Sequence, residues 1–325
     1  MNRREAVLAL AALGALGPRL ASSQSPAKSI GVLSLFRNPI RDEWMQPLAK
    51  LGWVGGKSIR IEDAVAAGQV ERLAKLAADL VGKKVDVIFA GGPDAAVEAV
   101  RATKTIPVVF FASAYPVEQG LVETLARPGG NVTGVAWNSA YVKQLEFVRQ
   151  VVPRAKRVAH FRMPTAIRTV NGKAFEGLFP LIESTAKGMG LEMKSFVVTK
   201  PEDFEQAFKD IKAWQAQALI TYATPPTVFA RQRIVEFANT NRIAGFFDWR
   251  GFVEAGGLFS YGPLISEMNA QAARQIDRIL RGARPADLPV ELPARYEFVI
   301  NRKTATALEI RIPNELMLRA DQVIE

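Results

Sequence analysis

Residues 85–94 read VDVIFAGGPD, and this stretch decides how the rest of the chain is interpreted. Its first six residues are apolar apart from one aspartate, which is typical of a strand buried inside a parallel sheet. A Gly-Gly-Pro turn follows, and Asp94 stands where it would cap a helix running to Thr103. The stretch therefore predicts a strand, a turn and a helix in direct succession.

The same unit recurs along the chain. Predicted strands cover 29–35, 58–64, 85–90, 107–111, 132–137, 157–161, 192–198, 218–221, 243–247, 257–260 and 296–301. Predicted helices cover 40–51, 70–82, 94–103, 119–125, 139–152, 174–189, 201–215, 227–241, 252–256, 267–282 and 303–308. Apolar strands that alternate with helices form parallel sheets covered on both faces, so the pattern predicts an α/β protein with two doubly wound lobes.

The first 25 residues are typical of an export signal. Arg3 and Arg4 precede an apolar run at 6–17, and small residues follow at 20–23. The run is about half the length that spans a bilayer, so we expect a cleaved signal peptide over residues 1–24. The paired arginines leave both the general and the twin-arginine export route open. With no cysteine in the chain, we expect a soluble periplasmic protein without a lipid anchor.

Composition narrows the function further. Of the 325 residues, 49% are hydrophobic and 23% charged, which is typical of a globular chain. The formal net charge is +10, but like charges form no long run, so we interpret it as a solvated basic surface and expect no nucleic-acid partner. A single histidine, His160, and no cysteine exclude the usual zinc sites and thiol nucleophiles.

Catalytic motifs are also missing. The sequence holds no G-x-S-x-G elbow and no phosphate-binding P-loop, so it predicts neither an enzyme nor a cofactor. Ligands of open parallel sheets bind beyond the carboxyl ends of the strands. The loops there carry aromatic rings, hydroxyls and few charges, a composition that suits a small-molecule cleft. Gly91 and Gly92 either bring backbone N–H groups close to a ligand or form an ordinary tight turn.

Three further stretches resemble a known family. They are 125–135 (LARPGGNVTGV), 252–263 (FVEAGGLFSYGP) and 279–290 (ILRGARPADLPV). In this order, and along the whole chain, they resemble the ABC transporter substrate-binding proteins of the tryptophan/tyrosine-type family. The resemblance implies the type I periplasmic-binding fold, in which a multi-strand hinge joins two lobes. It implies a first lobe over 28–137 plus about 263–290, and a second over 138–262 plus about 291–325.

The resemblance also implies a function. Such a protein is the periplasmic, monomeric solute-binding component of an ABC importer, which closes on a small molecule and delivers it to a permease in the inner membrane. The ligand class is an amino acid, an aromatic carboxylate or another small carboxylate. By analogy, the first lobe would hold a carboxylate with Gly92, Asp94, Ser113 and Tyr115. The second lobe would supply Tyr222, Thr224 and Asp248, with the acid pairing an ammonium group. Phe36, Trp137 and Trp249 would form the apolar wall.

Several alternatives stay open. Asp248 would serve equally well as a cap for the following helix, and Trp249 as packing under the hinge. Arg162 and Arg168 depart from the family pattern and bring two positive charges to the cleft, so we expect an acidic or aromatic-carboxylate ligand in preference to a simple amino acid. Other classes are a sensory protein that docks on a receptor, the ligand-sensing lobes of a transcription regulator, and an exported enzyme.

Overall fold

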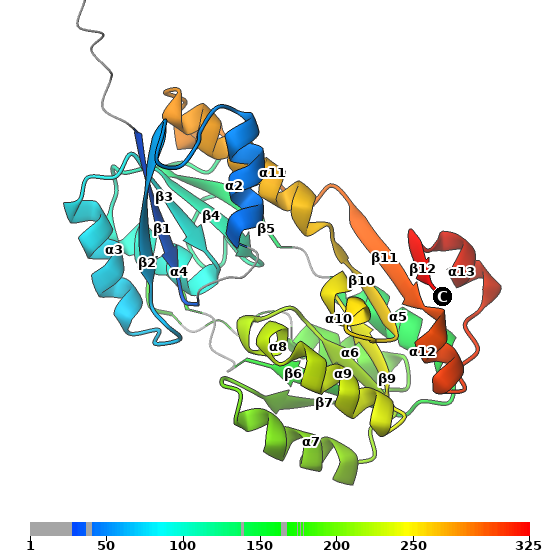
Figure 1. Cartoon of the computed structure of the whole chain (residues 1–325). Helices are drawn as coiled ribbons and strands as arrows, with labels where there is room; N and C mark the ends of the chain where they lie inside the picture. Colours follow the sequence, from blue (N-terminus) through cyan, green and yellow to red (C-terminus); the bar gives the residue numbers. More distant parts are fainter. Residues whose placement is uncertain are drawn as a thin grey trace, which may run out of the picture.

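The structure is a computed structural model that describes residues 28–36, 41–137, 140–163, 168–173, 175, 177 and 179–325. The predicted signal peptide, residues 1–24, lies outside the described residues. Two α/β lobes lie side by side, each built around its own sheet (Figure 1). The predicted fold class, two parallel-sheet lobes joined by a multi-strand hinge, is confirmed.

The sheet of the first lobe has five parallel strands in the order β2-β1-β3-β4-β5. They are β1 (Lys28–Ser34), β2 (Ile59–Val65), β3 (Val87–Gly91), β4 (Val108–Ser113) and β5 (Val132–Ala136). One face is covered by α3 (Arg72–Gly82) and α4 (Pro93–Ala102), and the other by α2 (Arg41–Lys50) and α11 (Ile265–Leu280). Strands buried on both faces explain the continuous apolar runs of the sequence.

The sheet of the second lobe has the order β12-β11-β10-β9-β8-β6-β7, and only the β10–β11 pair is antiparallel. Its strands are β6 (Arg157–Arg162), β7 (Glu192–Val197), β8 (Ala218–Thr221), β9 (Ala244–Phe247), β10 (Phe259–Pro263), β11 (Tyr296–Asn301) and β12 (Gln322–Ile324). Its helices are α5 (Tyr141–Val151), α6 (Phe179–Gly188), α7 (Asp203–Ala213), α8 (Pro225–Phe229), α9 (Arg231–Thr240), α10 (Arg250–Glu254), α12 (Arg302–Ala307) and α13 (Asn314–Arg319). A short 3₁₀ helix, η1 (Pro285–Asp287), follows α11.

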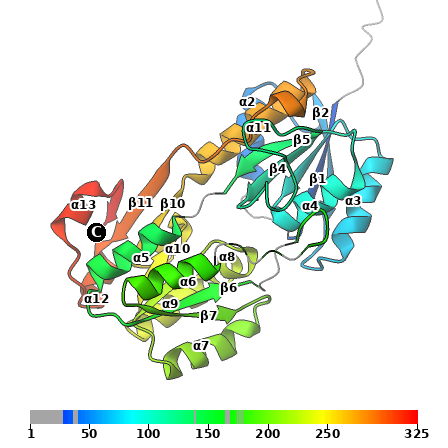
Figure 2. The same cartoon turned by 180° about the vertical axis from the view of Figure 1, so that it is seen from behind.

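Three neighbouring segments of the described chain connect the lobes, and we call them the hinge. They are the described parts of the connections from β5 to α5, from β10 to α11 and from η1 to β11 (Figures 1 and 2). The end of β5, where the first segment begins, is tied to the third segment by the bond from the Ala136 N–H to the Glu291 carbonyl, at 2.9 Å. The second and third are tied by the bond from the Leu264 N–H to the Arg295 carbonyl, at 3.0 Å. These bonds make the hinge one connected unit.

Most predicted elements are present, and two predictions are wrong. The expected helix at 119–125 is a series of turns, because Gly120 adopts a φ of +72° and interrupts helical hydrogen bonding. The expected single helix at 227–241 is two helices, α8 and α9, which meet at Ala230. The short helix α13 and the edge strand β12 were not predicted.

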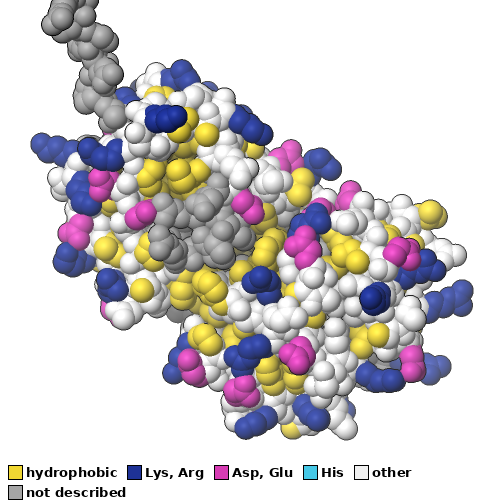
Figure 3. Space-filling view, in the orientation of Figure 1, with side chains coloured by type: hydrophobic (Ala, Val, Ile, Leu, Met, Phe, Trp, Pro, Cys, Tyr) yellow, Lys and Arg dark blue, Asp and Glu magenta, His cyan; other side chains and the backbone are white. Residues whose placement is uncertain are grey.

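The basic charge is spread over the surface. On the visible face in Figure 3, Lys and Arg side chains are scattered over both lobes and alternate with Asp and Glu. This distribution agrees with a solvated basic surface rather than a concentrated patch. Among the described residues, no helix combines the length and apolar character needed to cross a membrane.

Candidate functional site

Strand ends of the two lobes face each other across the gap between them (Figure 1). The first lobe contributes the loops after β1, β3, β4 and β5, and the second lobe those after β6, β8 and β9. All ten predicted site residues lie at these ends and within the described residues: Phe36, Gly92, Asp94, Ser113, Tyr115, Trp137, Tyr222, Thr224, Asp248 and Trp249. The rule that places ligands beyond strand ends thus defines one continuous region.

An aromatic cluster surrounds Tyr222 at the end of β8. Its ring centroid lies 4.1 Å from that of Tyr141 and 5.0 Å from that of His160, both edge-on. The Tyr222 hydroxyl is buried and has no hydrogen-bond partner among the described residues. Burial raises the pKa of Tyr222 well above its usual value, and the nearby Tyr141, Asp248 and Tyr115 raise it further. Since Tyr115 belongs to the first lobe, Tyr222 lies where the two lobes meet.

Asp248 is the buried acid of this region. It follows β9, whose Phe247 pairs with Thr221 of β8, so Asp248 and Tyr222 are neighbours across two adjacent strands. The Ala223 N–H donates to Asp248 Oδ1 at 2.7 Å. Burial raises the pKa of Asp248 to about 7, although this hydrogen bond favours the charged form. A carboxyl group with a pKa near 7 readily loses its proton at neutral pH. It is then suited to pairing with a ligand cation, because the pairing offsets the free-energy cost of burying the negative charge.

The first-lobe end of β3 turns directly into α4. Gly92 is the N-cap, with a φ of +99° that suits glycine, so the prediction that Asp94 caps this helix is wrong. The Gly92 N–H donates to the Phe111 carbonyl at 3.0 Å. Among the described residues, the N–H groups of Asp94 and Ala95 have no acceptor. Burial raises the pKa of Asp94, while the positive charge of Arg168 opposes that effect.

Ser113 and Tyr115 follow β4. Ser113 is fully buried, and its hydroxyl donates to Gln119 Oε1 through a short hydrogen bond. The Ser113 carbonyl accepts from the Trp137 N–H at 2.8 Å, which joins the ends of β4 and β5. The Tyr115 ring contacts Phe175 of the second lobe edge-on, with centroids 5.1 Å apart. The end of β4 is therefore a place of contact between the lobes.

The three predicted wall residues take different positions. Phe36 lies 6.1 Å, centroid to centroid, from Phe229 at the end of α8, so these two rings meet across the gap. Trp137 packs partly buried against the first-lobe core next to α11. Trp249 lies over Gly251, where an added β-carbon would be 2.4 Å from its ring. Thr224 precedes α8, and its N–H donates to the Thr227 hydroxyl at 2.9 Å.

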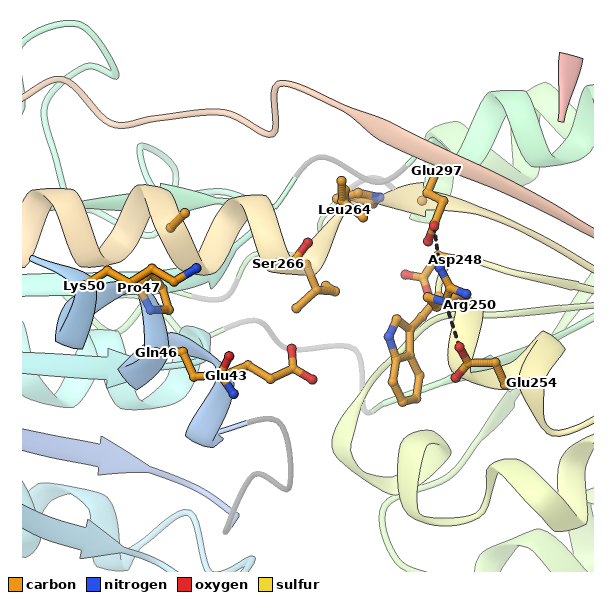
Figure 4. A pocket seen from close by; sticks show the side chains of 15 residues that line it. Glu43, Gln46, Pro47, Lys50, Asp248, Arg250, Glu254, Leu264, Ser266 and Glu297 are labelled. Carbon is orange, nitrogen blue, oxygen red and sulfur yellow. Dashed lines mark hydrogen bonds and ion pairs between the residues drawn. The ribbon is translucent and has the colours of Figure 1, made fainter. Parts of the chain in front are cut away.

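A cavity of about 610 Å³ opens between the lobes next to the hinge (Figure 4). Asp248 and Trp249 line it from the second lobe. Figure 4 shows Asp248 opposite the labelled side chains of α2. Arg250 is held there by Glu254 at 2.7 Å and by Glu297 at 2.6 Å. The full lining is Glu43, Gln46, Pro47, Lys50, Asp248, Trp249, Arg250, Glu254, Gly262, Pro263, Leu264, Ile265, Ser266, Ala270 and Glu297.

Sequence reasoning missed the α2 side of this cavity. Glu43, Gln46 and Lys50 are spaced by three and four residues, which places them on one face of a helix. That spacing was the available signal, but it is equally typical of any solvated helix face. Burial raises the pKa of Glu43, which agrees with its position facing the second lobe.

Arg162 and Arg168, the two arginines expected to attract an acidic ligand, differ in the side chains that they contact. Arg168 Nη2 lies 2.5 Å from Glu98 Oε1, a buried carboxylate that also pairs with Arg101. The guanidinium of Arg162 lies over the Phe179 ring at 5.1 Å. Glu98 therefore offsets part of the positive charge on which the expectation rested. Among the described residues, no group of three acidic or histidine side chains could hold a metal ion.

A family model described as ABC transporter substrate binding protein matches residues 31–324. The chain belongs to this family. This chain is 27% identical over 288 residues to the tyrosine-binding protein of Clostridioides difficile strain R20291. The match covers 87% of this chain and 81% of the relative.

Solved structures agree with this membership. A conserved domain protein from Vibrio cholerae is 26% identical, with a TM-score of 0.82. The ABC domain in complex with L-Trp from Streptococcus pneumonia is 24% identical, with a TM-score of 0.81. A ligand-free, open substrate-binding protein from Clostridium difficile is 24% identical, with a TM-score of 0.64. Each comparison covers 91% of this chain and 99% of the other. This chain therefore shares the fold of all three relatives over nearly its whole length.

Proposed function

We propose that the chain is the periplasmic solute-binding component of an ABC importer and that it binds an aromatic amino acid between its lobes. The observation that carries this proposal is the arrangement around Tyr222. A buried, unpartnered hydroxyl and a buried acid with a pKa of about 7, Asp248, lie together where the lobes meet. The Tyr141 ring of the second lobe contacts Tyr222, and Tyr115 of the first lobe is near enough to raise the pKa of Tyr222. The names of the relatives, a tyrosine-binding protein and a protein solved with L-Trp, support this ligand class.

Each end of an α-amino acid has a suitable partner in this proposal. The ammonium group pairs with Asp248, which gains a counter-charge for its burial. The carboxylate is bound at the start of α4, where the N–H groups of Asp94 and Ala95 point out of the helix. The aromatic side chain packs between Tyr115, Trp137 and Tyr222. A ligand that contacts both lobes favours their closed arrangement, because it binds that arrangement better than the open one.

Export and delivery complete the proposal. The leader-like composition of residues 1–24 supports export to the periplasm. The family supports delivery to a membrane permease. We further propose that the chain acts as a monomer and performs no catalysis.

A thermal-shift screen tests the ligand class. L-tyrosine, L-tryptophan and L-phenylalanine are compared with tyramine, which lacks the carboxylate, and 3-(4-hydroxyphenyl)propionate, which lacks the ammonium group. A ligand at 100 times its Kd stabilises a protein by about 2.7 kcal/mol, which gives a clear rise in Tm. We expect the amino acids to stabilise the protein and both truncated analogues to fail. Stabilisation by the propionate alone would instead support an acidic ligand and contradict the role of Asp248.

A further inference from the structure

Residues 168–173, which we call the latch segment, lie between β6 and α6 of the second lobe but are bound to the first lobe. The side chain of Arg101 in α4 donates to the Thr169 carbonyl at 2.7 Å and to the Val170 carbonyl at 3.1 Å. Figure 2 shows this green segment next to α4, on the side of the molecule away from β10 and β11, the strands that adjoin the hinge. The latch segment is therefore a contact between the lobes that is separate from the hinge.

Gln119 of the first lobe holds the latch segment from a second direction. Its Nε2 donates to the Arg168 carbonyl at 3.0 Å, and its backbone carbonyl accepts from the Val170 N–H at 2.8 Å. The Val170 side chain packs against the apolar core of the first lobe. Backbone groups of the latch segment thus find partners in the other lobe, which requires a fixed register between the two.

A buried carboxylate adds a charged contact. Glu98 is 4% exposed, and its Oε1 lies 2.8 Å from Arg101 Nη1 and 2.5 Å from Arg168 Nη2. Arg101 shares α4 with Glu98, whereas Arg168 belongs to the latch segment. Separation of the lobes would remove the bond from Arg168, so Glu98 would lose one of its two charge-assisted hydrogen bonds in a poorly solvated place.

The latch segment has a defined shape of its own. The Thr169 hydroxyl is buried and lies 2.8 Å from Asn171 Oδ1 and 2.6 Å from the Lys173 carbonyl. The Gly172 N–H donates to the Thr169 carbonyl at 3.1 Å, and Gly172 has a φ of +78° that suits glycine. A turn with this much internal bonding loses little conformational entropy when it docks.

One residue connects the latch segment to the ligand cleft. Gln119 Oε1 accepts from the Ser113 hydroxyl, while Gln119 Nε2 donates to the latch segment. Ser113 is the last residue of β4 and precedes the loop that carries Tyr115, so the same side chain supports the cleft and the lobe contact. We propose that residues 168–173 latch the second lobe to the first on the side away from the hinge and thereby slow the release of bound ligand. This inference rests on the proposed function, because it assigns the latch a role in ligand retention.

An engineered disulfide tests whether the two segments meet in solution. A β-carbon added at Gly120 would lie 3.6 Å from the Val170 β-carbon, close to the roughly 3.8 Å typical of disulfides. The chain has no other cysteine, so within one chain the pair Gly120→Cys/Val170→Cys can form only this bond. The two single-cysteine variants are the controls, since Gly120→Cys alone carries any strain from the positive φ. We expect rapid oxidation to an intramolecular disulfide and at least tenfold slower release of L-tyrosine, restored by reduction.

Arg101→Ala is the complementary test. Arg233→Ala is its matched control, because Arg233 likewise donates to a carbonyl, that of Pro201, and pairs with a carboxylate, Glu205, but within one lobe. Stopped-flow tryptophan fluorescence measures the release rate of L-tyrosine. We expect Arg101→Ala to raise this rate about tenfold, Arg101→Lys to restore part of it, and Arg233→Ala to leave it unchanged. Equal release rates in Arg101→Ala and Arg233→Ala would overturn the latch.

Small-angle scattering separates failure of the latch from failure of the proposed ligand. If L-tyrosine does not bind the unmodified chain, the proposed ligand is wrong, and the latch is judged by radius of gyration alone. The latch then requires a smaller radius after oxidation of the cysteine pair, or a larger radius in Arg101→Ala than in Arg233→Ala. A cysteine pair that stays reduced under oxidising conditions, or the absence of both differences in radius, would refute it.

Discussion

A β-carbon added to Gly262 would lie 1.7 Å from the carbonyl oxygen of Asp248. Gly262 belongs to β10, the strand that enters the hinge, and Asp248 is the buried acid at the end of β9. The two strands are neighbours in the sheet of the second lobe. Only glycine lets β10 lie this close to the loop that carries Asp248, the acid predicted to bind the ligand. A change at position 262 would therefore move both the start of the hinge and the Asp248 loop.

Gly262→Ala should therefore impair both stability and binding. The contact is with backbone, which cannot rotate away as a side chain would, so the strands must separate. Overpacking of this kind typically costs about 1–3 kcal/mol. We expect a loss of that size in urea unfolding, and weaker binding of L-tyrosine by calorimetry because the Asp248 loop moves. Gly82→Ala is the control, since nothing lies within 4 Å of an added β-carbon there. An equal loss of stability in both variants would show that the Asp248 contact is not the cause.

His160 should make the second lobe sensitive to acid. Burial, together with the positive charge of Arg162, lowers the pKa of His160 to about 3. The unfolded chain binds a proton at this residue below about pH 6.5, whereas the folded chain does not. Stability from this source is therefore present above pH 6.5 and is lost as the pH falls, by up to about 1.4 kcal/mol per pH unit. His160 is the only histidine of the sequence, so no other imidazole contributes to this effect.

Asp248 should oppose this slope in the same pH range. Its raised pKa means that the folded chain keeps a proton that the unfolded chain releases above about pH 4, so this contribution to stability declines as the pH rises to 7. We expect a nearly flat profile for the unmodified chain between pH 5 and 6.5. His160→Leu should become less stable with rising pH, and Asp248→Asn less stable with falling pH. Parallel profiles for the two variants in urea unfolding would contradict both assignments.

The sequence predicted the fold well because burial leaves a simple pattern. Val87 to Ala90 are almost fully buried on both faces of the sheet. Their unbroken apolar run is enough to predict a parallel strand. Gly120 shows where such patterns fail. Its neighbours favour a helix locally, but its positive φ ends the turn and brings Gln119 against the latch segment, a contact 49 residues away in sequence.

The candidate site was predicted only as a set of loops, because side-chain contacts between distant residues leave no pattern in the sequence. The strand-end rule located Tyr222 and Asp248, because it depends on topology alone. It did not show that the Ser113 hydroxyl is engaged by Gln119, because that bond depends on how the loop after β4 folds back. Nor did it show that Glu98 pairs with Arg168, because that contact depends on how the lobes meet. The predicted contacts of these residues with ligand stay predictions.

Tyr222→Phe should separate stability from function. The Tyr222 hydroxyl is buried without a hydrogen-bond partner among the described residues, and an unsatisfied polar group of this kind costs about 1–3 kcal/mol. Its removal should leave the ligand-free protein as stable as before or more stable. If the hydroxyl bonds to ligand, the same change should weaken L-tyrosine binding by about tenfold. Tm and calorimetry measure the two effects, and Tyr296→Phe in β11 is the control, because Tyr296 is not among the predicted ligand contacts. Unchanged affinity would remove Tyr222 from the ligand contacts.

Asp248 should give ligand binding a distinctive pH dependence. Burial raises the pKa of its carboxyl group to about 7 in the ligand-free protein, so at pH 6 most molecules carry a neutral acid there. An ammonium ligand binds the charged form, and the acid must first release its proton. Affinity for L-tyrosine should therefore rise by up to about tenfold per pH unit below pH 7 and level off above it. Asp248→Asn should weaken binding by at least about tenfold at pH 8 and abolish the pH dependence, because the amide does not titrate. Calorimetry between pH 5.5 and 8.5 measures both effects, and an equally steep profile in Asp248→Asn would assign the titration to another group.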